Sequence, residues 1–240
     1  MRWLRRATRP GAANGPDVMA SNRGPSVPDG NSESWLVAGL GNPGPQYARN
    51  RHNAGFMVAD VLAARLGSGF RRDRSRTQAA SGRLQSIGEA GTPGGLPVII
   101  AKPMSFMNLA GPPLTALGGF YKIPPERTII VHDDLDLPFG TIRLKLGGGD
   151  AGHNGLRSVS RALGTRDYYR VRVGIGRPPG RQDPAKFVLN DFSAAERREL
   201  PLVLERAADA VEALLRLGLP TAQNEFHPAG PAPSADSAGS

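Results

Sequence analysis

Apolar runs of strand length alternate with helical patterns between residues 35 and 226. Continuous apolar runs predict buried strands at 35–40, 97–101 and 128–132, and alternation of apolar and polar residues predicts a strand at 168–175. Two further strands are expected at 78–87 and 141–146. Strands that alternate with helices indicate an α/β fold: a single domain with a mixed, twisted β-sheet flanked by helices.

Helical spacing of apolar residues predicts helices at 53–67, 109–121 and 154–163. Ser193 and Glu196 form a capping-box pattern, and Pro201 is expected to restart a helix that buries the apolar residues after it. Four arginines within residues 71–76 suggest a basic, exposed connection.

Both ends of the chain differ from this central part. Residues 1–33 contain Gly, Pro, Ser, Asn and five Arg without apolar periodicity, and they are expected to form a disordered extension. Residues 227–240 are rich in Pro, Ala and Ser, and they are expected to form a disordered tail in which His227 has no role. The folded domain is therefore expected at 34–226.

The chain is basic throughout its central part. It has 30 Lys and Arg against 21 Asp and Glu, a net charge of +9, and residues 35–226 alone hold 25 bases and 17 acids. A basic globular domain favours a polyanionic partner, and nucleic acid first. The absence of cysteine excludes disulfides, zinc–thiolate sites and thiol nucleophiles. No run approaches the ~20 apolar residues of a membrane helix, so no membrane contact is expected.

Two glycine-rich segments follow expected strands. Residues 39–44 (GLGNPG) match the dinucleotide fingerprint, but that site needs a helix to open at once, and here Pro43 and Pro45 intervene. The glycines are expected to build a rigid turn, which argues against a nicotinamide-dependent oxidoreductase. Residues 147–152 either hold an anion with backbone amides or only permit a tight turn, and the sequence leaves both open.

Three of the four histidines, His52, His132 and His153, stand beside Asn or Asp at the ends of expected elements. Open α/β sheets keep their sites at the carboxyl ends of strands, where Asp133 is also expected. A carboxylate there would orient the His52 imidazole and favour its charged form, which suits a general base near neutral pH.

Other site chemistries have less support. Asp134 and Asp136 lie near Asp133, but no two-histidine spacing such as HExxH occurs, so no metal site is predicted. A serine nucleophile is disfavoured because no G-x-S-x-G segment is present. Asn42 could be only a turn residue, and Asn108 and Asn154 could only cap helices.

Taken together, the motifs resemble those of the bacterial peptidyl-tRNA hydrolase family in order and spacing. They are residues 39–44 (GLGNPG), 51–55 (RHNAG), 106–111 (FMNLAG), 132–138 (HDDLDLP), 146–149 (LGGG), 152–156 (GHNGL), 172–177 (RVGIGR) and 187–192 (FVLNDF). The resemblance covers about residues 35–226. It implies a cytoplasmic, monomeric, metal-free enzyme without a cofactor that hydrolyses the ester between peptide and tRNA, with peptidyl-tRNA as its partner and the large ribosomal subunit as a further one.

The resemblance also implies roles for single residues. His52 would be the general base, Asp133 would orient it, and Asn42 would distinguish a blocked peptidyl amine from a free one. Residues implied to line the substrate cleft are Tyr47, Phe106, Met107, Asn108 and Asn154. Candidates for tRNA phosphates are Arg143, Lys145, Arg170 and Arg172, for which a solvated basic strand face is the alternative.

Ala151 departs from the family pattern, because a glycine is common there, and the loop is expected to be stiffer or shifted. A competing class is an RNA-binding module without hydrolysis, since organellar relatives in plants act in RNA splicing. The basic surface suits both classes.

Overall fold

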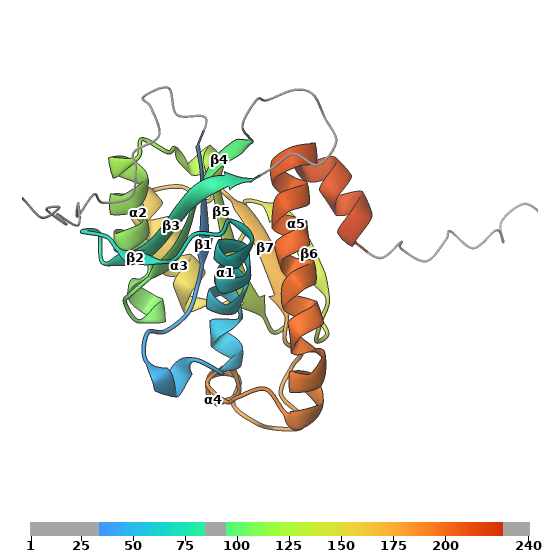
Figure 1. Ribbon diagram of the computed structural model, residues 1–240. Coiled ribbons are helices and arrows are strands. Elements are labelled where there is room, and N and C mark those ends of the chain that lie inside the picture. Colours follow the sequence, from blue (N-terminus) through green and yellow to red (C-terminus); the bar gives the residue numbers. More distant parts are fainter. Residues whose placement is uncertain (1–33, 85–94, 228–240) are drawn as a thin grey trace, which may run out of the picture.

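A computed structural model describes residues 34–84 and 95–227 of the chain. The two ends expected to be disordered fall outside these ranges, apart from His227 at the border of the second, and so do the last residues of the strand expected at 78–87. The described residues form one seven-stranded mixed sheet with helices on both faces (Figure 1), which confirms the expected fold class.

The sheet has the strand order β2-β3-β4-β1-β5-β7-β6. The strands are β1 (Trp35–Gly39), β2 (Arg71–Arg72), β3 (Thr77–Leu84), β4 (Leu96–Pro103), β5 (Thr128–Asp134), β6 (Ile142–Leu146) and β7 (Tyr169–Gly174). Strands β4, β1, β5 and β7 are parallel, and the other three are antiparallel to their neighbours. The carboxyl ends of four central strands therefore meet at one edge of the sheet.

Helices cover the two faces of the sheet in pairs (Figure 1): α1 and α5 pack on one face, and α2 and α3 on the other. The helices are α1 (Ala54–Arg65), α2 (Gly111–Phe120), α3 (Asn154–Leu163), α4 (Pro184–Val188) and α5 (Ala194–Phe226), and the 3-10 turns are η1 (Pro45–Tyr47), η2 (Arg51–Asn53), η3 (Met107–Leu109) and η4 (Pro125–Arg127). None of the helices in the described part has the length and apolarity that crossing a bilayer requires.

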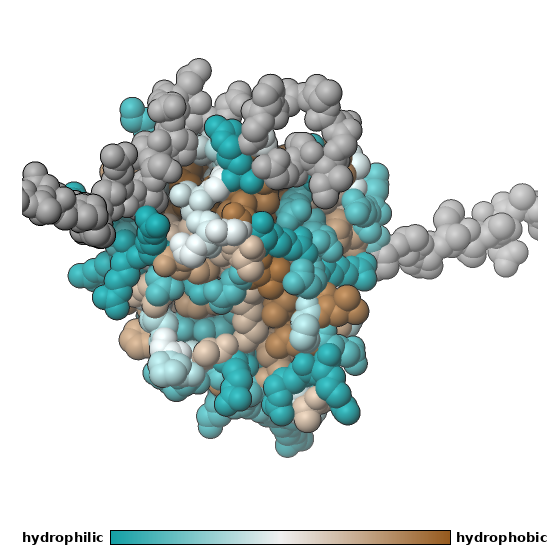
Figure 2. All heavy atoms as spheres, viewed as in Figure 1, coloured by the Kyte–Doolittle hydropathy of each residue, from teal (hydrophilic) through white to brown (hydrophobic). Residues whose placement is uncertain are grey.

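Each face of the sheet has its own hydrophobic core. Val58 and Leu62 of α1 meet Val211 and Leu214 of α5 in the first core, and all are buried. Apolar atoms are visible between α1 and α5, among hydrophilic side chains that surround them (Figure 2). Burying such a side chain contributes about 1.5–3 kcal/mol, so this contact fixes both helices on the sheet.

Glycines allow α1 to start directly against the sheet. A Cβ on Gly39 would lie 2.0 Å from the carbonyl oxygen of Gly55, and a Cβ on Gly55 would lie 2.3 Å from that of Val131. Only glycine permits backbones to approach so closely. Gly39 of the first glycine-rich segment thus serves a tight strand–helix packing, which goes beyond the rigid turn that the sequence predicts.

Three local expectations are wrong. Arg71 and Arg72 form the short strand β2 against β3, although a connection was expected there. The five-residue helix α4 was not expected. The capping box of Ser193 and Glu196 is confirmed, but α5 runs from Ala194 through Pro201 without a restart, although the proline, which has no N–H, cannot donate the usual helical hydrogen bond to residue 197.

Gly218 interrupts α5 with a φ of 76°, so the last turns of the helix change direction. They reach the edge strand β6, where Gln223 Nε2 donates to the Leu144 carbonyl at 3.0 Å and the Leu144 amide donates to His227 Nε2 at 3.0 Å. His227, expected to have no role in a tail, therefore ends α5 and binds the sheet.

Candidate active site

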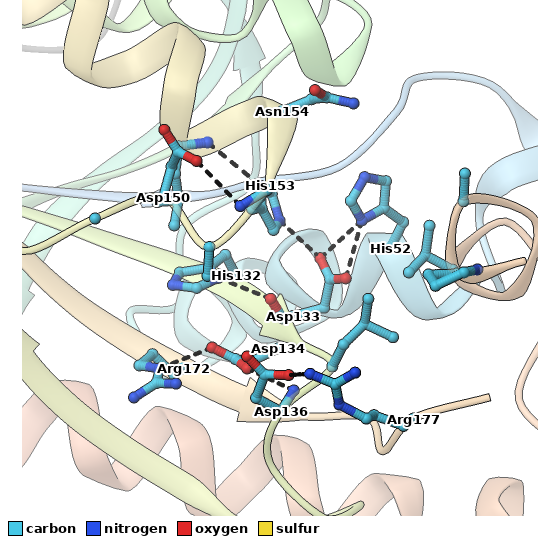
Figure 3. A pocket seen from close by; sticks show the side chains of 18 of the residues that line it. His52, His132, Asp133, Asp134, Asp136, Asp150, His153, Asn154, Arg172 and Arg177 are labelled. Atoms are coloured by element: carbon cyan, nitrogen blue, oxygen red, sulfur yellow. Dashed lines mark hydrogen bonds and ion pairs between the residues drawn. The ribbon is translucent and has the colours of Figure 1, made fainter. Parts of the chain in front are cut away.

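His52 and Asp133 meet at the carboxyl edge of the sheet. His52 lies in η2, immediately before α1, and Asp133 is the next-to-last residue of β5; both are buried. The Nδ1 atom of His52 lies 2.9 Å from both carboxylate oxygens of Asp133 (Figure 3). The pairing expected from the sequence is therefore present in the structure.

This contact fixes the protonation of the imidazole. An ionised carboxylate only accepts hydrogen bonds, so Nδ1 of His52 carries the proton and Nε2, on the far side of the ring, keeps its lone pair. Burial opposes the charged imidazole, but the charge and hydrogen bond of Asp133 outweigh burial and raise the pKa of His52 above its ordinary 6.5. Burial would raise the pKa of Asp133, yet His52 and His153 hold it far below its usual range.

His153 is a second partner of Asp133 that sequence reasoning missed. As the N-cap of α3, its Nδ1 accepts from the amides of Gly155 and Leu156 at 3.1 and 3.3 Å. Nε2 therefore carries the proton and donates to Asp133 Oδ1 at 3.0 Å. The glycine-rich approach to a helix start was visible in the sequence, but a histidine used as a cap was not.

His132, directly before Asp133 in β5, packs beside the histidine–carboxylate cluster. Its Nδ1 donates to the backbone carbonyl of Asp133 at 2.7 Å, and its ring packs edge-on against His153. Burial, followed by repulsion from His153, lowers the pKa of His132 to about 3, so this imidazole is neutral. Its Nε2 is buried and has no hydrogen-bond partner among the described residues, so its role is in packing.

Asn42 is held by the residue after His52. The Asn42 amide donates to Asn53 Oδ1, and Asn53 Nδ2 donates back to the Asn42 carbonyl, both at 2.9 Å. Asn42 Oδ1 in turn accepts from the Met107 amide at 2.8 Å, so its Nδ2 group remains as the donor. Asn53 was not singled out from the sequence, because it reads as an ordinary helix start.

The residues expected to line the cleft lie on two sides of the pair formed by His52 and Asp133. Phe106 is 55% exposed and stands edge-on to Tyr47, with ring centroids 6.4 Å apart. Met107 is buried against the first turn of α3, since a Cβ on Gly155 would lie 2.5 Å from its sulfur. Asn108 and Asn154 are exposed, the first in η3 and the second at the start of α3.

A cavity of about 770 Å³ opens beside His52, and Asn154 is among the residues that line it. Its lining begins at His52, Asp133 and His153 and extends to Lys145, Arg172 and Arg177. Figure 3 shows how these groups are arranged, from the imidazoles of His52 and His153 to Arg172 and Arg177. The lining also includes Asp134, Asp136, Asp150 and Asp183, so the cavity connects the buried histidine–carboxylate cluster with a surface of mixed charge.

The four basic candidates lie on neighbouring strands, where Arg143 pairs with Arg172 and Lys145 with Arg170. Lys145 is exposed, Arg143 is half-buried, and Arg172 Nε donates to Asp134 Oδ2 at 2.7 Å. Arg170 differs from them because it is only 2% exposed.

Arg170 holds the glycine-rich loop instead of facing solvent. Its guanidinium donates to the carbonyls of Gly148 and Gly149 and lies over the Tyr168 ring. Both terminal nitrogens of Arg170 are thus used within the protein, while its Nε has no hydrogen-bond partner among the described residues, and a contact of Arg170 with phosphate stays a prediction. Ala151, where a glycine was expected, has a φ of 46°, a conformation that favours glycine, so the loop keeps its left-handed backbone despite the Cβ.

His52, Asp133 and His153 also form a set that could hold a metal ion, the one such group in residues 34–84 and 95–227. Their ligand atoms lie within 4.8 Å of one another. In the geometry described, both histidine nitrogens donate to the carboxylate at hydrogen-bond distances of 2.9–3.0 Å. A metal would have to displace the protons that now order the site.

Comparisons with known proteins show the family of the chain. A family model described as peptidyl-tRNA hydrolase matches residues 36–234. The peptidyl-tRNA hydrolases of Frankia alni and Nocardia farcinica are 64% and 58% identical over 193 residues, which is 80% of this chain and 93% and 95% of theirs.

A solved structure of peptidyl-tRNA hydrolase from Acinetobacter baumannii has 34% identity and a TM-score of 0.71, and the match covers 82% of this chain and 96% of that chain. This chain therefore belongs to the peptidyl-tRNA hydrolase family.

Proposed function

We propose that this chain hydrolyses the ester that joins a peptide to the terminal ribose of tRNA and so recycles tRNA from peptidyl-tRNA. Its membership of the family supports the substrate class. The observation that carries the mechanism is the double contact of His52 Nδ1 with Asp133, which leaves Nε2 free toward the site.

In this mechanism His52 Nε2 removes a proton from a water molecule as the water oxygen attacks the ester carbonyl carbon. The resulting tetrahedral species breaks its bond to the ribose oxygen, which takes the proton back from the imidazolium. The products are a free peptide carboxylic acid and a tRNA hydroxyl. Asp133 stabilises the imidazolium between the two steps.

Asn42 is placed to contribute to the choice of substrate. Because its Oδ1 is occupied by the Met107 amide, its Nδ2 is the group left to donate a hydrogen bond. We assign that donor to a carbonyl of the peptide, which a blocked amine has and a free aminoacyl group lacks. Tyr47, Phe106 and Met107 would then lie beside the peptide, with Asn108 and Asn154 at its polar edge.

The tRNA would approach from the other side of His52, along the cavity that ends at Lys145 and Arg172, with Arg143 beside them. Positive side chains on one strand face suit phosphates without regard to sequence. We also propose that the enzyme acts as a cytoplasmic monomer on peptidyl-tRNA from stalled ribosomes, with the large ribosomal subunit as a transient partner.

The test is release of tRNA from an N-acetylated aminoacyl-tRNA in EDTA, for the wild type and His52→Ala. We expect wild-type cleavage in EDTA and a loss of about 10²–10⁴-fold in kcat for the variant, the usual contribution of a general base. Binding of tRNA should change little.

Retained turnover in His52→Ala would refute the mechanism, and loss of wild-type turnover in EDTA would instead point to a metal at His52, Asp133 and His153. Tight tRNA binding without cleavage by either protein would favour the RNA-binding module.

A further inference from the structure

We propose that Arg51 and Glu196 are positioning residues for the general base, joining the turn that carries His52 to the start of α5. The inference rests on the proposed role of His52 and adds residues that touch neither substrate nor the reacting atoms. Arg51 directly precedes His52 in η2, whereas Glu196 lies 145 residues later in the chain.

Both terminal nitrogens of Arg51 are hydrogen-bonded, while its buried Nε has no hydrogen-bond partner among the described residues. Its Nη2 donates to Glu196 Oε2 at 2.6 Å and its Nη1 donates to the carbonyl of Asp191 at 2.6 Å, while its guanidinium lies 4.2 Å over the Phe187 ring. The side chain is 8% exposed. Such a planar fork cannot be replaced by a lysine, which offers a point charge without the stacking surface.

The backbone on both sides of the contact is tied as well. The Arg51 amide donates to the Asn190 carbonyl at 3.1 Å, and Asn50 Nδ2 donates to Asp191 Oδ1 at 2.8 Å. Residues 50 and 51, directly before His52, are therefore attached to residues 190–191 through main chain and side chains together. α4 and the start of α5 lie beside the turn at the same end of the molecule (Figure 1).

Glu196 gives the contact a rigid base. It belongs to the capping box of α5, where its Oε2 also accepts from the Ser193 amide at 2.6 Å. Burial opposes its ionisation, but hydrogen bonds from Ser193 and the charge of Arg51 keep the pKa of Glu196 below its usual value. Since α5 is packed on α1 and the sheet, the Glu196 carboxylate is fixed relative to the core. Its contact with Arg51 therefore fixes the position of the turn that carries His52.

The alternative is that these contacts only hold the chain together. A positioning role predicts more: without the contact, His52 would drift from Asp133 while staying buried, so the pKa of its imidazole would fall. A displacement of about 1 Å at a catalytic group can cost about 10²-fold in rate. Turnover and its pH profile should therefore change together, with little change in KM.

The experiment compares Arg51→Lys and Glu196→Gln with two controls. Ser193→Ala removes the other half of the capping box but leaves Arg51 and Glu196 in place, and Glu205→Gln removes a charge of the same helix from its contact with Arg65, away from the site. We measure kcat and KM on N-acetylated aminoacyl-tRNA from pH 5 to 9 and the thermal midpoint of each variant.

We expect kcat to fall about ten- to a hundredfold for Arg51→Lys and Glu196→Gln, with KM within about twofold and the inflection at lower pH. The controls should keep both the wild-type kcat and its inflection. Unchanged kcat in the folded Glu196→Gln variant, or an equal loss in Ser193→Ala, would overturn the proposal. If His52→Ala kept turnover, the proposed mechanism itself would fail, which is a distinct result.

Discussion

The two halves of the site differ in how far the protein determines their side chains. In the buried half, His52, Asp133 and Asn42 each have partners that fix their orientation and, for the imidazole, its proton. In the open half, Phe106 and Asn108 project into solvent. The neighbours His153 and Asn154 show the contrast within one helix turn, since the first caps α3 and the second is exposed.

This difference between the buried and the open half corresponds to two parts of the substrate: the ester, which is always the same, and the peptide, which varies. Every substrate presents the same ester, so the groups that act on it gain from being held in advance. Peptides differ in sequence, so the surface that receives them gains from exposed aromatic and amide groups. Variants in the buried half should therefore reduce kcat, and variants in the open half should raise KM.

Among the variants that separate the two halves of the site, Asp133→Asn should have the largest effect. Its amide oxygen can still accept from His52 Nδ1, but the negative charge that stabilises the imidazolium is lost. We expect kcat to fall about 10²-fold. Because the pKa of His52 is raised by Asp133 against its burial, the inflection of kcat should move to lower pH.

The direction of this shift in the kcat inflection follows from the protonation state of the base. The neutral imidazole is the base, so activity rises as pH increases through the His52 pKa, which lies above 6.5 in the wild type. A pH–rate profile from 5 to 9 checks the direction. An inflection at higher pH in Asp133→Asn would contradict the assignment of the charge.

The double variant Arg143→Ala with Lys145→Ala should act on the tRNA side alone. We expect KM to rise about tenfold at low salt with kcat unchanged, and the wild-type advantage to shrink as salt increases. Each lost phosphate contact lowers the slope of log affinity against log salt by about 0.7–0.9. If the slope of log affinity against log salt were equal in the two proteins, Arg143 and Lys145 would not contact phosphates and would only form a solvated strand face.

A smaller effect is expected for His153→Asn. Asparagine can cap α3 in place of the imidazole, so the helix should keep its start. The hydrogen bond to Asp133 Oδ1 is lost, and we expect kcat to fall about fivefold, in line with one charge-assisted hydrogen bond near the base. Circular dichroism and kcat measured together check that the fold is kept.

The smallest effect should come from Phe106→Ala in the open half. Its ring is half exposed and contacts Tyr47 edge-on, so we expect KM for the N-acetylated substrate to rise about threefold with kcat unchanged. A loss in kcat larger than that in Asp133→Asn would break the division between the halves.

The sequence was sufficient for features set by local periodicity and by strand ends. The central strands, the start of α3 and the capping box of Ser193 follow from spacing, and the meeting of His52 with Asp133 follows from the shared edge of parallel strands. The residue patterns of the family then supplied the cleft residues, whose roles stay predictions.

Features that depend on distant contacts could not be predicted. Arg170 and Arg172 share one face of β7, as an exposed pair would, but Arg170 is buried and donates to two carbonyls of the glycine-rich loop. His153 became a partner of Asp133 because two backbone amides fix its tautomer. Two-residue β2 and five-residue α4 are too short to leave a periodic pattern.

The end of α5 has a consequence for the behaviour of the molecule in solution. An edge strand with open amide and carbonyl groups is a template for pairing with a second chain, and aggregation can begin there. Gln223 and His227 occupy both groups of Leu144 in the middle of β6, much as a neighbouring strand would. The short helical segment after Gly218 therefore covers this part of the edge strand and opposes self-association. A chain that lost the segment would expose β6 to intermolecular pairing.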